Sequence, residues 1–254
     1  MELNFKQNIT AQYKSQAQVA RVLTEDWVLS EIYCPNCGGS LAGYINNKPV
    51  ADFYCLKCAE DFELKSKKGK IGSKVTAGAY SEMIKRIGSS QRPNFFFLAR
   101  QESVSVTDLF VVPKYFFVPG IIEKRKPLRE NAKRAGWVGS NILFSKIPFA
   151  GQIHYVKDGV EILKEEVLDK WNKTKFLKAV QRPESKGWIL DIMNCIDELK
   201  KNEFSLSDLY EFEKALHEIH PNNKNVKPKI RQQLQFLRDK RYLEFVGEGR
   251  YRLV

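Results

Sequence analysis

The sequence has no long hydrophobic run, and it has too few acidic residues to balance its basic ones. Its richest apolar segments, Phe95–Ala99 and Tyr115–Ile122, are far shorter than the ~20 residues that a membrane-spanning helix needs. The first residues also lack the apolar core of a secretory signal. We therefore expect neither a membrane protein nor an exported one, and the sequence predicts a soluble cytoplasmic protein.

The shortage of acids leaves a strongly basic chain. Its 254 residues include 42 Lys and Arg against 30 Asp and Glu, a net charge of +12. A hydrophobic content of 43% is enough to build a core and excludes a wholly disordered chain, and the length fits one or two domains. The charge favours a polyanionic partner, nucleic acid before a membrane surface, although a solvated basic surface is the plain alternative.

Four of the five cysteines form two C-x2-C pairs with seventeen residues between them, namely Cys34, Cys37, Cys55 and Cys58. This spacing is typical of a four-thiolate structural zinc site, and Gly38 and Gly39 allow the close backbone approach that such a site needs. Two disulfides are the alternative, which a reducing compartment disfavours. Cys195 lies in an apolar helical stretch and is expected to be a small buried hydrophobe.

Two short strands are predicted on either side of the second cysteine pair, over residues 49–55 and 59–65. Paired as a hairpin, they would place Asp52 beside Glu63, and Lys65 would share the face of Glu63 because side chains alternate along a strand. The order Asp52, ten residues, Glu63, one residue, Lys65 resembles the PD-(D/E)xK nuclease motif, although its proline, Pro49, stands three residues before the aspartate.

This resemblance implies a catalytic role for all three residues. Asp52 and Glu63 would hold Mg2+, which prefers oxygen ligands, and Lys65 would orient the attacking water. The alternative is that the three side chains are ordinary solvated charges on a surface hairpin.

Basic residues follow the motif in two further segments. Lys67 and Lys68 belong to a Gly- and Lys-rich loop over residues 66–74 that suits phosphate contacts, or that is simply a flexible surface loop. A helix is predicted over 76–89, and strands over 94–100, 108–112, 141–147 and 152–156. Residues 123–136, which include Lys133 and Arg134, read as a second DNA-facing element. Trp137 follows directly and is either a core residue or an exposed DNA contact.

The C-terminal part predicts a winged helix, a variant of the helix-turn-helix. Apolar residues recur at helical spacing over 188–201, and a second helix begins near Phe204 with Ser205 or Ser207 as its cap. A third helix is predicted over 227–240, followed by a hairpin over 242–254.

Positive charge is concentrated on this third helix and the wing. Residues 181–220 carry a net charge of −4, whereas residues 221–254 carry +6. The pattern favours DNA over protein as the partner of the winged helix. The candidate DNA-binding side chains of the third helix are Lys229, Arg231, Gln232, Gln233 and Gln235.

Runs such as YCPNCG, FELKSKKG, RPNFFFLAR, RAGW and KIRQQLQFLRDK, together with matches at both ends of the chain, resemble the DpnI-like restriction endonucleases. The resemblance implies cleavage of double-stranded DNA at adenine-methylated GATC, with Mg2+ as the catalytic metal and Zn2+ as the structural one. It also implies that Trp137 contacts the methyl groups. No membrane and no obligate protein partner are expected.

The fold that we predict is therefore an α/β (α+β) PD-(D/E)xK nuclease domain with an embedded four-cysteine zinc site, followed by a small winged-helix domain. The boundary is predicted between a catalytic domain over 1–180 and a DNA-binding domain over 181–254, with a linker over 173–187. The alternative function is a DNA-binding regulator with a zinc ribbon and a winged helix but no catalytic activity, and the Asp52–Glu63–Lys65 set distinguishes the two because a regulator does not need it.

Overall fold

The chain is divided into two compact units. The computed structural model describes residues 1–44, 51–89 and 92–254. The first unit comprises residues 1–145 and 150–172, and the second comprises 146–149 and 173–254. The boundary predicted from the sequence at residues 180 and 181 stays a prediction.

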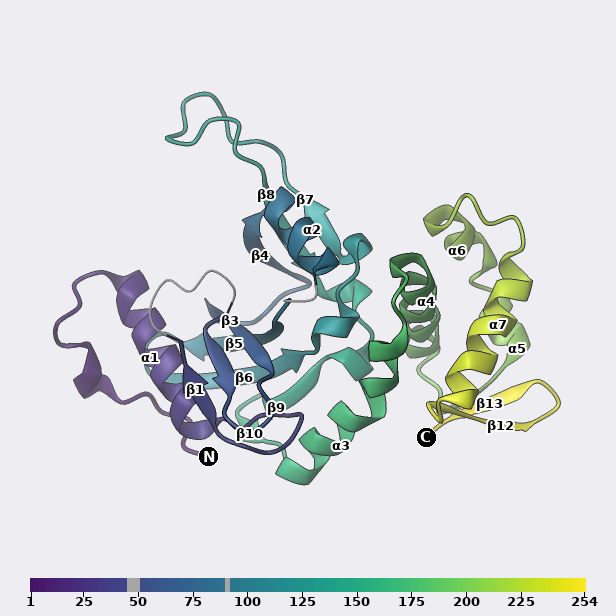
Figure 1. The fold of residues 1–254 in the computed structure, drawn as a ribbon, viewed down its shortest axis with the longest axis horizontal. Helices are drawn as coiled ribbons and strands as arrows, with labels where there is room; N and C mark the ends of the chain where they lie inside the picture. Colours follow the sequence, from purple (N-terminus) through teal and green to yellow (C-terminus); the bar gives the residue numbers. More distant parts are fainter. Residues whose placement is uncertain (45–50, 90–91) are drawn as a thin grey trace. The chain divides into compact units, whose positions relative to one another are not determined.

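The first unit is built on a seven-stranded sheet with the order β1-β2-β3-β5-β6-β9-β10 (Figure 1). β3 and β5 pair in parallel, and the other neighbours are antiparallel. The strands are β1 (Leu41–Gly43), β2 (Phe53–Cys55), β3 (Asp61–Lys68), β5 (Asn94–Gln101), β6 (Ser105–Val112), β9 (Ile153–Lys157) and β10 (Val160–Glu161).

Aromatic side chains fill both faces of this sheet. On one face the Phe62 and Phe96 rings stack at 4.8 Å within a buried cluster that also holds Trp27 of α1 (Gln16–Glu31) and Trp171 of α3 (Lys164–Thr174). On the other face Phe97 packs edge-on against Phe144 at 4.6 Å. A sheet buried on both sides explains the almost continuous apolar run of β5.

A smaller sheet with the order β4-β8-β7 carries a long loop (Figure 1). Its strands are β4 (Lys74–Ala79), β8 (Gly139–Leu143) and β7 (Ile122–Lys124), and α2 (Tyr80–Gly88) contacts all three. The loop over residues 125–138 connects β7 to β8 and projects away from both sheets in Figure 1. It contains the basic segment that the sequence marks as DNA-facing.

Two predicted elements of this unit differ from the structure, and a third is only partly described. The helix predicted over 76–89 begins only at Tyr80, because residues 74–79 pair with β8 as a strand and this pairing overrides local helix preference. The strand predicted over 141–147 ends at Leu143, where a short 3-10 helix (Phe144–Lys146) begins. Residues 49 and 50 of the first hairpin strand lie outside the described residues.

The second unit has the helices and hairpin of a winged helix. Buried stripes of α4 and α7 face each other, and a three-stranded sheet with the order β11-β13-β12 closes the unit. The elements are α4 (Pro183–Leu199), β11 (Glu203–Ser205), α5 (Leu206–Tyr210), α6 (Glu213–Ile219), α7 (Val226–Asp239), β12 (Leu243–Gly247) and β13 (Arg250–Leu253). Cys195 is buried on α4, as expected.

Capping decides where the second helix of this unit begins. The Ser205 hydroxyl accepts from the backbone N–H of Asp208, and the Asp208 carboxylate accepts in return from the backbone N–H of Ser205. This capping box confirms Ser205 rather than Ser207 as the cap. The segment predicted as a linker, over 173–187, is largely helical: it holds the end of α3, a 3-10 helix (Lys175–Ala179) and the first turn of α4, whose Pro183 suits a helix start.

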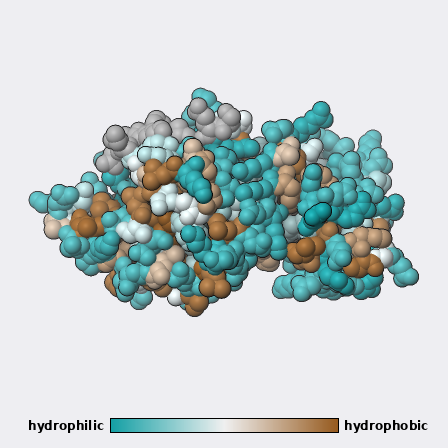
Figure 2. Space-filling view, turned by 60° about the horizontal axis from the view of Figure 1, so that its bottom comes forward, coloured by the Kyte–Doolittle hydropathy of each residue, from teal (hydrophilic) through white to brown (hydrophobic). Residues whose placement is uncertain are grey.

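Hydrophilic residues cover most of the face seen in Figure 2, with hydrophobic residues in small separate patches. Among the described residues, no helix combines the length and the apolar composition that crossing a membrane requires.

Asp197 gives the second unit a pH-dependent stability. Its carboxylate on α4 accepts a hydrogen bond from the backbone N–H of Phe149 at 2.7 Å, and burial raises its pKa to about 6. Because the folded state binds this proton more tightly than the unfolded state, the stabilisation is complete below about pH 4 and is lost as pH rises through 6. Asp197→Asn should therefore raise the free energy of unfolding at pH 7.5 by about 1–3 kcal/mol, and the thermal midpoint with it. At pH 4 both quantities should be nearly unchanged.

The exposed neighbour Glu198 supplies the control, because Glu198→Gln removes the same charge from the same helix. Melting curves of both variants between pH 4 and 8 measure the effect. Equal pH profiles for the two variants would contradict the assignment to Asp197.

Candidate functional site

The β2–β3 hairpin brings Asp52 close to Glu63, whose charge acts on it. Phe53 of β2 pairs with Phe62 of β3, and Asp52 stands directly before Phe53 in the chain as Glu63 stands directly after Phe62. The backbone N–H of Asp52 donates to the carbonyl of Phe62 at 2.9 Å, and the Asp52 carboxylate accepts from the backbone N–H of Leu64 at 2.6 Å. The aspartate is thus fixed by bonds from both its backbone and its side chain to the strand that carries the glutamate.

Glu63 contacts two cations. Its Oε1 lies 2.5 Å from Lys65 Nζ, and its Oε2 lies 3.0 Å from a guanidinium nitrogen of Arg86 on α2. The Glu63 side chain is only 13% exposed. These contacts join Lys65 and Arg86 to Glu63, and the charges of Glu63 and Lys65 also act on Asp52, so the predicted trio lies together.

The surroundings of Asp52 disfavour its charge. Burial is the largest cause that raises its pKa, the Leu64 N–H opposes it, and the charge of Glu63 raises the pKa further. Glu25 on α1 also has a raised pKa, from burial first and from the charge of Asp52 in addition. A divalent cation bound between these carboxylates would offset their mutual repulsion. Carboxylate oxygens are ligands that fit Mg2+.

The four paired cysteines converge, with their sulfur atoms all within 4.8 Å of one another. Cys34 and Cys58 lie 3.6 Å apart and Cys37 and Cys55 lie 3.4 Å apart, sulfur to sulfur. A disulfide would need about 2.05 Å, whereas four sulfurs at about 2.3 Å from one tetrahedral zinc lie about 3.8 Å apart. The sulfur set therefore fits Zn2+ and not a pair of disulfides.

Neighbouring residues shape this cluster closely. A Cβ atom at Gly39 would lie 3.4 Å from the Cys37 sulfur and 3.0 Å from the Cβ of Lys57, so a larger residue would have to displace these neighbours by a few tenths of an ångström. The Asn36 amide donates to the Cys58 sulfur at 3.3 Å and accepts from the Trp171 indole at 3.1 Å. Burial of Cys58 would raise its pKa, but hydrogen bonds, that of Asn36 first, lower the pKa to about 7.

The basic side chains predicted to face DNA lie at several places in the first unit. Lys67 lies on the same face of β3 as Glu63 and Lys65, whereas Lys68 alternates to the other face and pairs with Glu102. Lys133 and Arg134 are exposed in the loop over 125–138.

Trp137 belongs to the same loop and not to the buried core. The Arg134 guanidinium lies over its ring, 4.7 Å from the ring centroid. A Cβ at Gly139 would come within 2.8 Å of the indole, so the ring rests directly on the glycine backbone. The indole is thus held half-buried between a cation and a glycine, with part of its surface open.

The predicted DNA-binding side chains of α7 differ in their exposure to solvent. Arg231, Gln232 and Gln235 are exposed, and Lys229 is half-buried and donates to Gln232. Gln233 is only 5% exposed, so its placement on the DNA-facing surface is wrong. With 3.6 residues per turn, position 233 falls on the inward stripe of Ile230 and Leu237.

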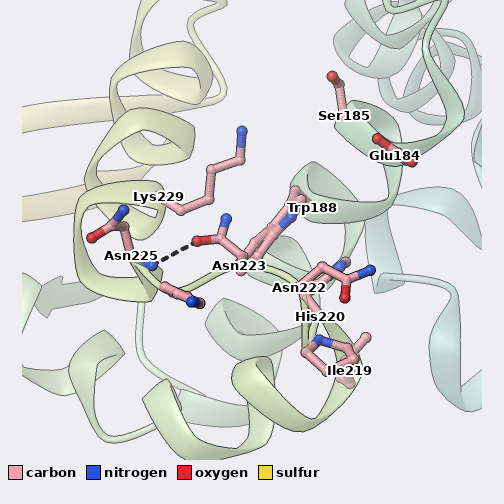
Figure 3. Close-up of a pocket in the computed structure, with 11 residues that line it drawn as sticks. Glu184, Ser185, Trp188, Ile219, His220, Asn222, Asn223, Asn225 and Lys229 are labelled. Atoms are coloured by element: carbon pink, nitrogen blue, oxygen red, sulfur yellow. Dashed lines mark hydrogen bonds between the residues drawn. The ribbon is translucent and has the colours of Figure 1, made fainter.

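A pocket of about 640 Å3 opens at the N-terminal end of α7 (Figure 3). Trp188 of α4 lines it and stacks on His220 with ring centroids 3.9 Å apart, and His220 contacts Asp191 at 2.8 Å. Asn223 and Asn225 are linked by a hydrogen bond of 2.8 Å, dashed in Figure 3. Amides at the start of the third helix add donors and acceptors that can meet base edges.

Sequence reasoning missed Arg86, Glu25, Asn36 and the asparagines of this pocket. Arg86 and Glu25 meet the Asp52–Glu63 pair only through tertiary packing, so their positions in the chain carry no signal. Asn36 stands between Cys34 and Cys37, and only this position in the sequence could have indicated that it hydrogen-bonds to a sulfur of the cluster.

Replacing one cysteine tests the zinc assignment. Cys55→Ser removes a sulfur at the end of β2, so we expect loss of zinc, a lower thermal midpoint and disorder of the adjacent Asp52. Cys195→Ser is the control, since it changes a buried cysteine outside the cluster. Zinc content of the purified variants measures the effect, and full zinc retention by Cys55→Ser would contradict it.

Comparison with family models matches both parts of the chain. The model of the DpnI, or Dam-replacing, family matches residues 1–180, and the model of the Dam-replacing HTH domain matches residues 184–253. These matches agree with a mixed α/β first unit that holds a four-cysteine cluster and a second unit built as a helix-turn-helix. The chain belongs to the DpnI (Dam-replacing) family.

Proposed function

We propose that the protein is a methyl-directed type II restriction endonuclease that hydrolyses phosphodiester bonds in double-stranded DNA at adenine-methylated GATC. The observation that carries the cleavage chemistry is that the Asp52 carboxylate is held beside Glu63 by the Leu64 N–H, with the Lys65 ammonium on the Glu63 carboxylate. The methylated GATC site rests on the resemblance to the family.

The PD-(D/E)xK mechanism assigns a separate task to each group. Asp52 and Glu63 would hold Mg2+, which when bound neutralises charge on the phosphate and acidifies a water. Lys65 orients the attacking water through its ammonium protons and offsets charge on the phosphate. Lys67 adds a further cation on the same face of the strand. A DNA-binding regulator would have no use for this arrangement.

Reading a methyl group in two places would explain why a nuclease unit carries a winged helix. Burying one methyl group is worth about 0.8 kcal/mol, and a methyl-sized difference in a pocket gives about 10–200-fold discrimination. Sparing unmethylated DNA requires more than one such step. In this proposal Trp137 reads methyl groups for the nuclease unit, and the exposed face of α7 reads them for the second unit.

Plasmids from two hosts test this proposal most directly. With Mg2+, the protein should cut plasmid from an adenine-methylating host and leave plasmid from a non-methylating host intact. Asp52→Asn should abolish cutting, by at least about a thousandfold, while DNA affinity changes little, because a ligand to the metal is lost and the basic surfaces remain. Cleavage of both plasmids, or near-normal cleavage by Asp52→Asn, would contradict the proposal.

Trp137→Ala tests the methyl contact. Because Trp137 belongs to the loop over 125–138 and is not buried in the core, we expect melting to change little while the preference for methylated over unmethylated GATC falls about tenfold or more. Competition gel shifts in Ca2+ measure this preference. Leu128→Ala, in the same loop, is the control. A large loss of stability with the preference unchanged would restore a purely structural role for the tryptophan.

A further inference from the structure

Both oxygens of the Glu63 carboxylate are engaged by cations from different elements. Lys65, two residues along the same strand, contacts Oε1 with its ammonium group. A guanidinium nitrogen of Arg86 on α2 lies 3.0 Å from Oε2. Arg86 is 29% exposed and Glu63 is 13% exposed, so the pair is largely shielded from solvent. In this state the carboxylate charge is already offset from both sides.

A metal ion that binds Glu63 must therefore compete for an oxygen atom. A divalent cation and a guanidinium placed on the same Oε2 repel each other, so one of them has to leave. Lys65 contacts the other oxygen, Oε1, and need not move, whereas Arg86 occupies Oε2 itself. Arg86 is thus the cation that can withdraw when the metal arrives.

The helix that carries Arg86 is tied to the projecting loop. The backbone N–H of Tyr80, the first residue of α2, donates to the carbonyl of Val138 at the end of that loop at 3.0 Å. Lys124, directly before the loop, lies over the Tyr80 ring at 5.7 Å from its centroid. Two turns further along α2, Arg86 contacts Glu63. One short helix therefore joins the basic loop to the carboxylate of the candidate metal site.

We propose that Arg86 is a positioning residue that occupies Glu63 while DNA is absent and transfers to a DNA phosphate when the duplex binds, which frees Oε2 for the divalent cation. Guanidinium groups bind phosphate bidentately, so the exchange replaces an ion pair in which Oε2 accepts no hydrogen bond with a hydrogen-bonded contact. The consequence is that DNA binding and metal binding favour each other. This inference rests on the proposed nuclease function.

Calorimetric titration of the full-length protein with Ca2+ tests the exchange, since Ca2+ takes oxygen ligands and leaves a thiolate cluster alone. Arg86→Gln should bind Ca2+ on the order of tenfold more tightly than the wild type when DNA is absent, because the competing charge is gone. Addition of a methylated GATC duplex, checked by electrophoresis for intactness, should tighten Ca2+ binding to the wild type and have little effect on the variant.

Three further variants make the result decisive. Lys85→Gln removes a positive charge from an exposed position of the same helix and should behave as the wild type. Arg86→Lys keeps the charge and should retain weak binding without DNA. Asp52→Asn should lose Ca2+ binding in every condition.

The outcomes separate the two proposals. If Asp52→Asn weakens Ca2+ binding but Arg86→Gln binds Ca2+ no more tightly than the wild type, the role of Arg86 is wrong and the nuclease function stands. If Asp52→Asn binds Ca2+ as the wild type does, both proposals are overturned. A lower melting point of Arg86→Gln with unchanged Ca2+ affinity would show that the ion pair is only structural.

Discussion

The pairing of β2 with β3 is the constraint on which the candidate site depends. β2 has only three residues, and a strand this short is not stable by itself. It is held by β1 on one side, by β3 on the other and by the cysteines that flank the turn between β2 and β3. A slip of one residue would turn Glu63 to the opposite face of the sheet, away from Asp52. The four-cysteine cluster thus fixes the register that keeps the two carboxylates together.

Local pattern was enough to predict much of this arrangement. The two cysteine pairs, the alternation of Phe62 and Leu64 with Glu63 and Lys65, and the capping residue Ser205 are signals that lie within a few residues of one another. They depend on turn geometry, on strand alternation and on helix capping, which are local rules. The convergence of the four sulfur atoms and the placement of Asp52 beside Glu63 follow from them.

Features that depend on packing between distant segments were not predictable in this way. Thr76 joins a strand because β8 offers a partner, although its own segment suits a helix. Gln233 is buried on the inward stripe of α7, although its polar side chain suits the surface. Arg86 reaches Glu63 across 23 positions of the chain, and its sequence neighbours carry no trace of that contact. In each case a tertiary partner, and not local preference, decides the outcome.

The parallel pairing of β3 with β5 has a consequence for folding. Among the described strands of the large sheet, β3 and β5 are the neighbours that run in the same direction, and the segment between them contains β4 and α2. Parallel neighbours cannot be joined by a tight turn, so β5 reaches β3 only after this crossover has been made. The crossover carries Arg86, and β3 carries Glu63 and Lys65. A partly folded chain therefore has the acidic and basic groups but not their arrangement, and chain entropy delays assembly of the candidate site until the crossover has closed.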